Sequence, residues 1–426
     1  MMDDISKTDP EIYASIKKEL ERQQLGLEMI PSENNVSKAV LQAMGSILTN
    51  KYSEGLPGKR YYGGNKYIDV VEQLAIDRAK QLFGCEHVNV QSLSGSPANL
   101  AALYAVLGIG DKFMGLELAH GGHLTHGAAV NFSGQMFKPV PYGVSQETEM
   151  FDYDEIRKIA LREKPKLILS GLTAYPREID FSAFQEIADE IEAYHMADIA
   201  HIAGLVVGGV HQSPIPYCDI VTTTTHKTLR GPRGAIIMSK TEDRYHDKYH
   251  PNSQKNLAQM INFAVFPCFQ GGPHNHTNAA KAVAFNEAMQ PEFKDYARQI
   301  VKNARALAES LMSHGFRLVT GGTDNHLILA DLRNKEVTGK EAETALDEVG
   351  ITVNKNMVPF DPRKPWDPSG IRLGTPVLTT RGMKEDEMNC VGELINRAIK
   401  HRSDAAAKEK VRQDVLELCR QFPFYD

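Results

Sequence analysis

A reactive lysine is the first chemistry that the sequence offers. Lys227 ends the run Thr222 to Lys227, which holds four threonines and a histidine, and a glycine-rich turn follows at Gly231 to Gly234. A lysine amine becomes a useful nucleophile when its surroundings lower its pKa or hold it as a Schiff base. Asp198 and His201 lie on the apolar segment before this run. Enzymes that use pyridoxal phosphate (PLP) pair such a lysine with a carboxylate at the pyridine nitrogen, so we predict a PLP site at Lys227 and Asp198.

A second cluster of small residues is suited to the phosphate of that cofactor. The run Ser94-Gly95-Ser96-Pro97 precedes residues up to Leu107 that favour a helix. Ser96 is a suitable N-cap, and Pro97 suits the first turn. The free N–H groups and the positive dipole at such a helix start attract anions. A serine cap alone only starts a helix, but beside a cofactor lysine it predicts a phosphate site.

Three histidines at a three-residue spacing raise the alternative of a metal site. They are His120, His123 and His126. Gly121 and Gly122 argue against a regular helix that would bring the three rings together, and no acidic ligand is interleaved. We therefore predict no metal at this segment.

The composition excludes several classes of function. The chain has 426 residues, of which 42% are hydrophobic, and a net charge of −6, so it can bury a large core and is expected to form two domains. It has neither a basic stripe for nucleic acid nor an apolar run long enough to cross a membrane. The start of the chain lacks an export signal, and the five cysteines contain no Cys-x-x-Cys pair. We expect a cytoplasmic protein without nucleic acid or membrane partners.

The segments that must position the predicted site alternate between strand and helix patterns. Apolar strand patterns at Leu167 to Ser170, Met196 to Asp198 and Ile220 to Thr222 are separated by helical patterns, which predicts an α/β fold with a mainly parallel sheet. Ligands of such sheets bind at the carboxyl ends of the strands. Asp198 and Lys227 are expected at that edge.

Longer strings of residues resemble a single family. The matching strings are Ile30 to Asn34, Thr49 to Gly64, Leu118 to Gly127, Thr222 to Gly234 and Thr320 to His326. They occur in the family's order, and the resemblance covers nearly the whole chain, from about Glu21 to Tyr425. On these strings the sequence resembles the serine hydroxymethyltransferases.

The resemblance implies an architecture. It is that of the fold-type I PLP-dependent transferases, similar to aspartate aminotransferase, with a mostly parallel central sheet in a large domain and a smaller α+β C-terminal domain. The implied parts are an N-terminal helical arm at 1–50 that contacts the partner subunit, a large PLP-binding domain at 51–278 and a small domain at 279–426. Helical patterns between Asn275 and His314 agree with a change of domain there. A homodimer with shared active sites is implied, and a tetramer is left open.

The resemblance also implies a reaction. The family transfers the hydroxymethyl carbon of serine reversibly to tetrahydrofolate, giving glycine and 5,10-methylenetetrahydrofolate, with PLP attached to Lys227 as a Schiff base. Thr224 and His226 are implied to orient that lysine, and Glu54 to move protons to and from the serine hydroxyl and the folate. The implied cofactor contacts are Asp198, His201, His123, Ser94, Gly95, Ser96 and Thr173, with Tyr52, Gly271 and Gly272 from the neighbouring subunit.

Substrate contacts follow from the same resemblance. Arg372 is implied as the bidentate clamp for the substrate carboxylate, a task that suits a planar guanidinium. Ser32, Tyr62 and Glu54 are implied to contact the substrate as well. The implied folate pocket consists of Leu118, Gly122, His123, Leu124, Tyr61 and Asn356, and the implied catalytic set is Lys227, Glu54, His226, Thr224, His123 and Tyr62.

Two other functions stay open. A PLP-dependent aldolase of the threonine type would cleave β-hydroxy amino acids without folate, and Glu54, Tyr61 and Asn356 argue against that as the main activity. A non-catalytic scaffold or RNA-associated homologue needs no reactive lysine, and the intact Lys227 and Arg372 argue against it. Folate-independent aldolase activity is expected as a side reaction.

Overall fold

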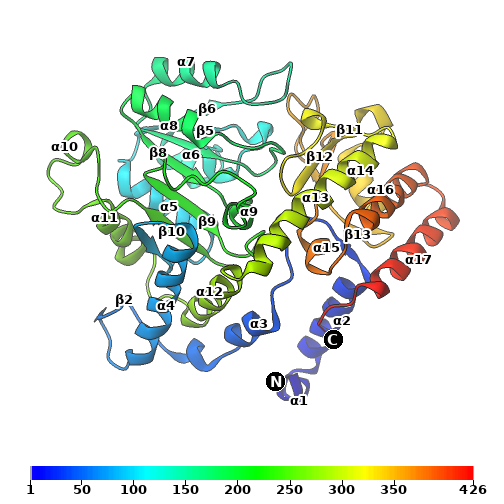
Figure 1. The fold of residues 1–426 in the computed structure, drawn as a ribbon, viewed down its shortest axis with the longest axis horizontal. Helices are drawn as coiled ribbons and strands as arrows, with labels where there is room; N and C mark the ends of the chain where they lie inside the picture. Colours follow the sequence, from blue (N-terminus) through cyan, green and yellow to red (C-terminus); the bar gives the residue numbers. More distant parts are fainter. Residues whose placement is uncertain (1, 426) are drawn as a thin grey trace.

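A seven-stranded sheet forms the centre of the larger part of the molecule. In this computed structural model, which describes residues 2–425, the strand order is β4-β10-β9-β8-β7-β5-β6 (Figure 1). Neighbouring strands are parallel, except that β10 is antiparallel to β4 and to β9. The strands are β4 (His87–Asn89), β5 (Lys112–Leu116), β6 (Lys138–Tyr142), β7 (Leu167–Gly171), β8 (Tyr194–Asp198), β9 (Ile220–Thr224) and β10 (Ala235–Ser239).

The register of three neighbouring strands brings the predicted chemistry to one edge of this sheet. Gly171 at the end of β7 lies opposite Asp198 at the end of β8, and Asp198 lies opposite Thr222 on β9. Lys227 follows shortly after β9 ends at Thr224. The prediction that Asp198 and Lys227 lie at the carboxyl edge of a parallel sheet is therefore confirmed.

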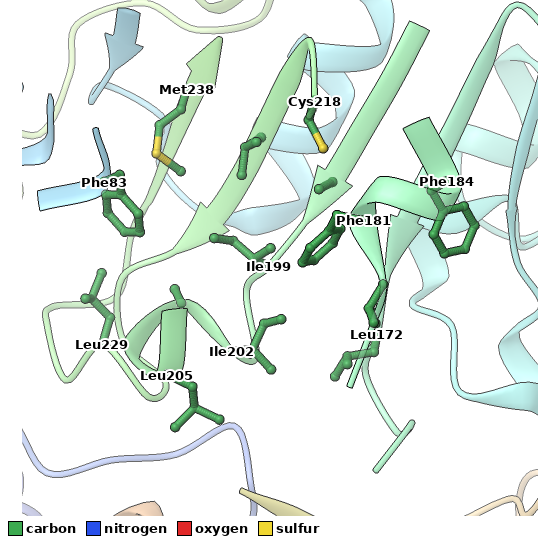
Figure 2. Packing of buried hydrophobic residues seen from close by; sticks show 14 of the residues in the cluster. Phe83, Leu172, Phe181, Phe184, Ile199, Ile202, Leu205, Cys218, Leu229 and Met238 are labelled. Atoms are coloured by element: carbon green, nitrogen blue, oxygen red, sulfur yellow. The ribbon is translucent and has the colours of Figure 1, made fainter. Parts of the chain in front are cut away.

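Helices cover both faces of the sheet, so the strands β7 to β10 are buried along their whole length. Such burial is expected for parallel strands between two helical layers. Figure 2 shows part of one layer, in which Phe181, Phe184, Ile202 and Leu205 pack with Ile199. The helices of this domain are α4 (Lys66–Phe83), α5 (Gly95–Val106), α6 (Phe132–Met136), α7 (Tyr153–Glu163), α8 (Phe181–Glu190), α9 (Ala203–Val207), α10 (His246–Tyr249), α11 (Leu257–Phe263) and α12 (Asn275–Ala288).

A smaller antiparallel sheet organises the C-terminal domain. Its strand order is β11-β12-β15-β14, and Leu329 on β12 lies opposite Arg372 on β15. A separate hydrophobic core that includes Ile328 and Leu394 fills this domain. Its elements are β11 (Arg317–Leu318), β12 (Leu327–Asp331), α14 (Gly339–Asp347), β13 (Ile351–Thr352), β14 (Asn354–Asn356), β15 (Gly370–Gly374), α15 (Pro376–Thr380), α16 (Glu385–Lys400) and α17 (Ala405–Gln421).

The long helix α13 (Pro291–Ser313) connects the two cores (Figure 1). Phe293 and Val301 pack into the core of the large sheet, whereas Leu307 and Leu311 belong to the core of the small domain. The change of core therefore falls inside α13, beyond the boundary at residue 278 that the resemblance implied. No helix within residues 2–425 is both long and apolar enough to cross a membrane.

The N-terminal segment attaches to its own chain. The short strand β1 (Leu27–Glu28) pairs in parallel with β13, and Gln24 of α2 (Pro10–Leu25) donates to the carbonyl oxygen of Phe424 at 2.9 Å. Helix α3 (Lys38–Met44) packs on α12 through Val40. The remaining elements before α4 are α1 (Met2–Thr8), β2 (Gly55–Leu56) and β3 (Lys59–Arg60). A contact of the 1–50 arm with a partner subunit stays a prediction.

Truncation of a core ring should show how much of the stability comes from this packing. Phe184 is fully buried and meets the rings of Tyr142, Phe151 and Tyr153. Phe184→Ala is expected to cost about 3 kcal/mol because it leaves a cavity. Leu161→Ala on the neighbouring α7, where the side chain is exposed, should cost less than about 0.5 kcal/mol. Urea denaturation followed by circular dichroism measures both, and equal midpoints for the two variants would contradict the expectation.

Candidate active site

A cavity of about 350 Å³ lies at the carboxyl edge of the large sheet, within the size range of small-molecule sites. Strand ends of the large domain form most of its lining, and Arg372 enters from the small domain. The predicted site residues that line it are Ser32, Ser94, Gly95, Ser96, His123, Thr173, Asp198, His201, Thr224, His226, Lys227 and Arg372. Five further lining residues were not among the predicted site residues: Glu33, Asn99, Leu172, Ala200 and Arg233.

Lys227 faces the cavity and is otherwise enclosed by protein. A tight turn follows it, in which the N–H of Gly231 donates to the carbonyl oxygen of Thr225 at 2.7 Å and Arg230 has a left-handed φ of 58°. Enclosure lowers the pKa of the Lys227 ammonium to about 8, while the Asp198 carboxylate opposes this shift. An appreciable fraction of the amine is therefore uncharged near neutral pH, as a nucleophile requires.

Asp198 is a carboxylate held by three hydrogen bonds. Asn99 Nδ2 donates to it at 2.8 Å, the N–H of Ala200 at 3.0 Å and His126 Nε2 at 3.3 Å. Burial raises the pKa of Asp198, but the contacts with His126, His123 and Asn99 outweigh burial and hold the pKa below its usual value. Asp198 therefore stays ionised at neutral pH and can hold a proton on a nitrogen atom placed beside it.

His126 is a site residue that sequence reasoning missed. Its Nδ1 accepts the backbone N–H of His123 at 3.2 Å, so Nε2 carries the proton that is donated to Asp198. Asn99 is oriented in the same way, because Thr222 Oγ1 donates to its side-chain oxygen at 2.6 Å. The spacing of the three histidines was the one available signal for His126, and it had been weighed only as a metal site.

The start of helix α5 forms the part of the cavity suited to an anion. Ser94 is the N-cap, two residues before the predicted Ser96, and its hydroxyl makes no capping hydrogen bond to the helix. A Cβ on Gly95 would lie 2.8 Å from Thr224 Cγ2. Only glycine therefore lets this helix start approach the strand that leads to the lysine. The N–H groups of the first turn have no partners inside the helix and favour an anion.

The other histidines of the cavity are neutral. Burial lowers the pKa of His123 to about 4 and that of His226 to about 3. His201 Nδ1 lies 3.2 Å from Nε2 of His326 in the small domain, and burial lowers the pKa of both rings below the usual range. His201 thus joins the two domains and also lines the cavity, and its contact with the cofactor stays a prediction.

Arg372 is a buried cation with neutral partners. Its Nε donates to Asn354 Oδ1 at 3.1 Å, and Nη1 donates to the carbonyl oxygen of Thr173 at 2.7 Å. Burial lowers its pKa to about 10, so the guanidinium remains charged at neutral pH. No carboxylate within residues 2–425 forms an ion pair with it. A buried guanidinium without a counter-ion is suited to bind the carboxylate of a ligand.

A second group of predicted residues, which we call the Tyr52 cluster, lies apart from this cavity. The Tyr52 hydroxyl donates to Glu54 Oε1 at 3.2 Å, and its ring meets that of Tyr62 edge-on with 5.4 Å between centroids. Gly271 and Gly272 complete the cluster, since a Cβ on either would come within 3.2 Å of Glu54 or Tyr52 atoms. None of the five lines the cavity, and the two tyrosines are 56% and 51% exposed.

A buried arginine fixes the backbone around Glu54. Arg60 Nη1 donates to the carbonyl oxygens of Ser53 at 2.9 Å and Gly55 at 2.7 Å, the two neighbours of Glu54. Its Nη2 bonds to Glu72 at 2.7 Å, and both of these side chains are almost fully buried. Because breaking a buried ion pair leaves an uncompensated charge, this arrangement resists change. No local sequence pattern indicates that Arg60 holds the Glu54 loop.

The predicted folate residues stand on three separate segments. Leu118 and Leu124 are 46% and 43% exposed and offer an apolar surface after β5. Gly122 between them is required by a close approach, because a Cβ there would lie 2.0 Å from the carbonyl oxygen of Leu116. Tyr61 packs against Phe266, with 5.5 Å between ring centroids, and Asn356 ends β14.

The lining of the cavity fits PLP. It combines an amine of lowered pKa, an ionised carboxylate and a helix start suited to a phosphate, which are the three groups that this cofactor needs from its protein. Neutral His123 offers a ring that can pack on an aromatic cofactor. With the mainly parallel sheet, the site defines the class of the chain as a fold-type I PLP-dependent enzyme.

Comparison with known proteins narrows the class to a family. The model of the serine hydroxymethyltransferase family matches residues 5–395. Two curated relatives named serine hydroxymethyltransferase, from two strains of Leptospira biflexa serovar Patoc, are each 57% identical over 419 residues, which is 98% of this chain and 97% of each relative. The chain belongs to the serine hydroxymethyltransferase family.

The reaction follows from this membership. The enzyme is a PLP-dependent transferase that interconverts serine and glycine, and tetrahydrofolate is the co-substrate that carries the transferred carbon. Family membership therefore supports the hydroxymethyl transfer as the main function, rather than a threonine-type aldolase or a non-catalytic scaffold.

The titration of Lys227 tests the electrostatics of the cavity. In the cofactor-free protein its amine should titrate near pH 8, so acetylation of Lys227 by an amine-reactive reagent should accelerate through that pH. Asp198→Asn removes the charge that raises the lysine pKa, and its midpoint should move to lower pH. Peptide mass spectrometry measures the rates, with the exposed Asp154→Asn as the control that keeps the original midpoint. An unchanged midpoint in Asp198→Asn would show that the two groups are not coupled.

Proposed function

We propose that the cavity binds serine through Arg372 and Ser32 while Lys227 and the start of α5 hold the cofactor. When bound, PLP withdraws electrons from the substrate α-carbon and so permits the bond to the hydroxymethyl group to break. The observation that carries the proposal is that Arg372, a buried cation without a counter-ion, faces the same cavity as Lys227. The ionised Asp198 is suited to keep a proton on the ring nitrogen.

Thr224 and His226 are proposed to orient Lys227 and the bound ligands. Thr224 Oγ1 donates weakly, at 3.4 Å, to the carbonyl oxygen of Ala200, so its hydroxyl can reorient toward a ligand. His226 Nδ1 is buried and has no hydrogen-bond partner within residues 2–425. A buried polar atom of this kind is costly unless a ligand supplies its partner. Thr173, which keeps a hydroxyl at the cavity wall, is proposed to contact the cofactor.

Glu54 is proposed to act as the proton-transferring group of a neighbouring subunit's site. The support is that the Tyr52 cluster lies outside its own Lys227 cavity and exposes its tyrosines. A second copy of the chain related by two-fold symmetry would place the same cluster of each subunit against the other's cavity. We therefore propose a homodimer in which Tyr52, Glu54, Tyr62, Gly271 and Gly272 of one subunit complete the site of the other. The N-terminal 1–50 arm is proposed to add to this contact.

The folate is proposed to bind at the mouth of the shared site. The exposed Leu118 and Leu124 supply an apolar wall, and Tyr61, next to Tyr62 of the Tyr52 cluster, supplies an aromatic ring. Asn356 supplies an amide for a heterocyclic edge, since a side-chain amide both donates and accepts hydrogen bonds. This arrangement keeps the folate near Glu54, which has to serve both substrates.

Removal of Arg372 tests the carboxylate clamp. Arg372→Ala should raise KM for serine by about two orders of magnitude, because a charge-assisted bidentate contact is lost, and should leave the absorbance of the bound cofactor intact. Arg363→Ala, an exposed arginine of the same domain, is the matched control and should keep the original KM. Steady-state kinetics with serine and tetrahydrofolate measure both, and an ordinary KM in Arg372→Ala would remove this residue from substrate binding.

Mixed dimers test whether Glu54 serves the neighbouring subunit. Glu54→Gln and Lys227→Ala should each be inactive in the folate-coupled reaction, because each lacks one required group in every site. When the two variants are denatured and refolded together, hybrid dimers carry one intact site, so about a quarter of the original activity should return. Separate refolding of each variant is the control. Failure of the mixture to recover activity, with hybrids confirmed by a size tag, would place both residues in the same subunit's site.

A folate-independent cleavage of other β-hydroxy amino acids is proposed as a side reaction. Its support is that Lys227, Asp198 and Arg372 share one cavity, whereas the implied folate residues other than His123 do not line it. Any such amino acid retains the carboxylate that Arg372 is proposed to bind.

We also propose a cytoplasmic enzyme, since its five cysteines are free, which suits a reducing compartment.

A further inference from the structure

Hydrogen bonds and an ion pair join two segments from different domains beside the cavity, and we call this set of contacts the clasp. One is the 173–177 loop, Thr173 to Arg177, which follows β7 in the large domain. The other is the 320–326 segment, Thr320 to His326, which precedes β12 in the small domain. The 320–326 segment is one of the sequence strings on which the family resemblance is based. None of its residues has been assigned a role in catalysis or cofactor binding.

Arg177 makes the most directed contacts between the two segments. Its Nε donates to Thr320 Oγ1 at 2.9 Å, Nη2 donates to the Thr320 carbonyl oxygen at 2.6 Å, and Nη1 pairs with Asp324 Oδ1 at 3.0 Å. Thr320 holds a left-handed φ of 61°, which a non-glycine residue rarely adopts. Gly322, at φ 150°, also lies beside this side chain, because a Cβ there would be in van der Waals contact with Arg177 Nη2 at 3.4 Å. The 320–326 segment is thus wrapped around one guanidinium.

Backbone groups of the 173–177 loop are also occupied by the 320–326 segment. The carbonyl oxygen of Pro176 accepts the N–H of Asp324 at 2.9 Å and the hydroxyl of Thr323 at 3.1 Å. The fully buried Asn325 donates from Nδ2 to the carbonyl oxygen of Tyr175 at 3.2 Å. These contacts fix the loop along its length, because buried donors and acceptors are costly to leave unpaired.

The clasped loop is the one that holds Arg372. The carbonyl oxygen of Thr173 accepts Arg372 Nη1 at 2.7 Å. The N–H groups of Thr173 and Ala174 donate to the carbonyl oxygen of Gly121 at 2.8 and 3.1 Å. On the other side, the 320–326 segment leads into β12, where Leu329 lies opposite Arg372. Both the strand that carries Arg372 and the loop that receives it therefore depend on the clasp.

We propose that Arg177 is a positioning residue for the substrate-carboxylate clamp. By tying the 320–326 segment to the 173–177 loop, it fixes where the small domain docks and so where the Arg372 guanidinium stands in the cavity. This inference rests on the proposed role of Arg372 in binding serine. A displacement of about 1 Å in such a group is enough to weaken a directed contact strongly.

A double-mutant cycle between Arg177 and Arg372 tests the proposal in the full PLP-loaded enzyme. Arg177→Ala should raise KM for serine about ten-fold, with kcat changed by less than about two-fold and with KM for tetrahydrofolate retained. In the Arg372→Ala background the same substitution should change KM for serine by less than about two-fold, because the group it positions is gone. The cofactor absorbance, recorded for every variant, should stay unchanged.

Arg317→Ala is the matched control. Arg317 bridges the same two domains by pairing with Glu149 at 2.6 Å, and Glu149 also accepts the N–H of Thr320 at 2.9 Å, but Arg317 makes no hydrogen bond to the 173–177 loop. Its substitution should leave KM for serine within about two-fold of the original value. Arg177→Lys keeps the charge without the planar fork and should fall between Arg177→Ala and the original enzyme. It replaces Arg177→Ala in the cycle if that variant does not fold.

The possible contrary results distinguish a failure of the Arg177 proposal from a failure of the Arg372 proposal. An equal rise of KM in Arg317→Ala, or an Arg177 effect that adds fully to that of Arg372→Ala, would show that Arg177 only stabilises the domain contact, and would overturn the proposal. An unchanged KM in Arg177→Ala would overturn it as well. An unchanged KM in Arg372→Ala alone would instead overturn the proposed clamp on which the inference rests.

Discussion

The charge balance of the Lys227 cavity is the constraint on which the rest of the site depends. Lys227 and Arg372 are enclosed cations, and their pKa values fall to about 8 and about 10. Asp198 is ionised, but its single negative charge cannot neutralise both cations. Positive charge in a site of low dielectric favours anionic ligands strongly. A phosphorylated cofactor and an amino-acid carboxylate are the two anions that this arrangement accommodates.

The sheet produces this arrangement through its register. Because β7, β8 and β9 are parallel and end together, the chain leaves Gly171, Asp198 and Thr224 at the same edge. Fully buried strands cannot shift by one residue without turning polar side chains into the core. Asn99 at the start of α5 then connects Asp198 to Thr222 through its side-chain amide. The position of the carboxylate is therefore determined by the same packing that stabilises the large domain.

The parts of the site that follow from local patterns could be predicted, and those that depend on distant pairing could not. Strand ends at Asp198 and Thr222 are visible in a short window, so the edge position of Asp198 and Lys227 followed from the sequence. His126 stands 72 residues before Asp198, and no local signal connects the two. The N-cap of α5 is Ser94, whereas the sequence predicted Ser96. Both serines are suitable N-caps by residue type, so the sequence alone does not distinguish them. In the structure Ser94 has the extended backbone that suits a cap. The change of core inside α13 escaped prediction because a continuous helix carries no boundary signal.

The two main chemical tasks depend on different parts of the structure. In the proposed function, serine binding depends on Arg372, whose strand belongs to the small domain and whose partner oxygen belongs to the 173–177 loop. Proton transfer is the role proposed for Glu54, whose flanking carbonyl oxygens accept hydrogen bonds from Arg60 within the large domain. A movement of the small domain would therefore alter the grip on the substrate without disturbing the Glu54 loop. Because Arg60 and Glu72 are buried together, the backbone around Glu54 is held by contacts that do not involve the small domain.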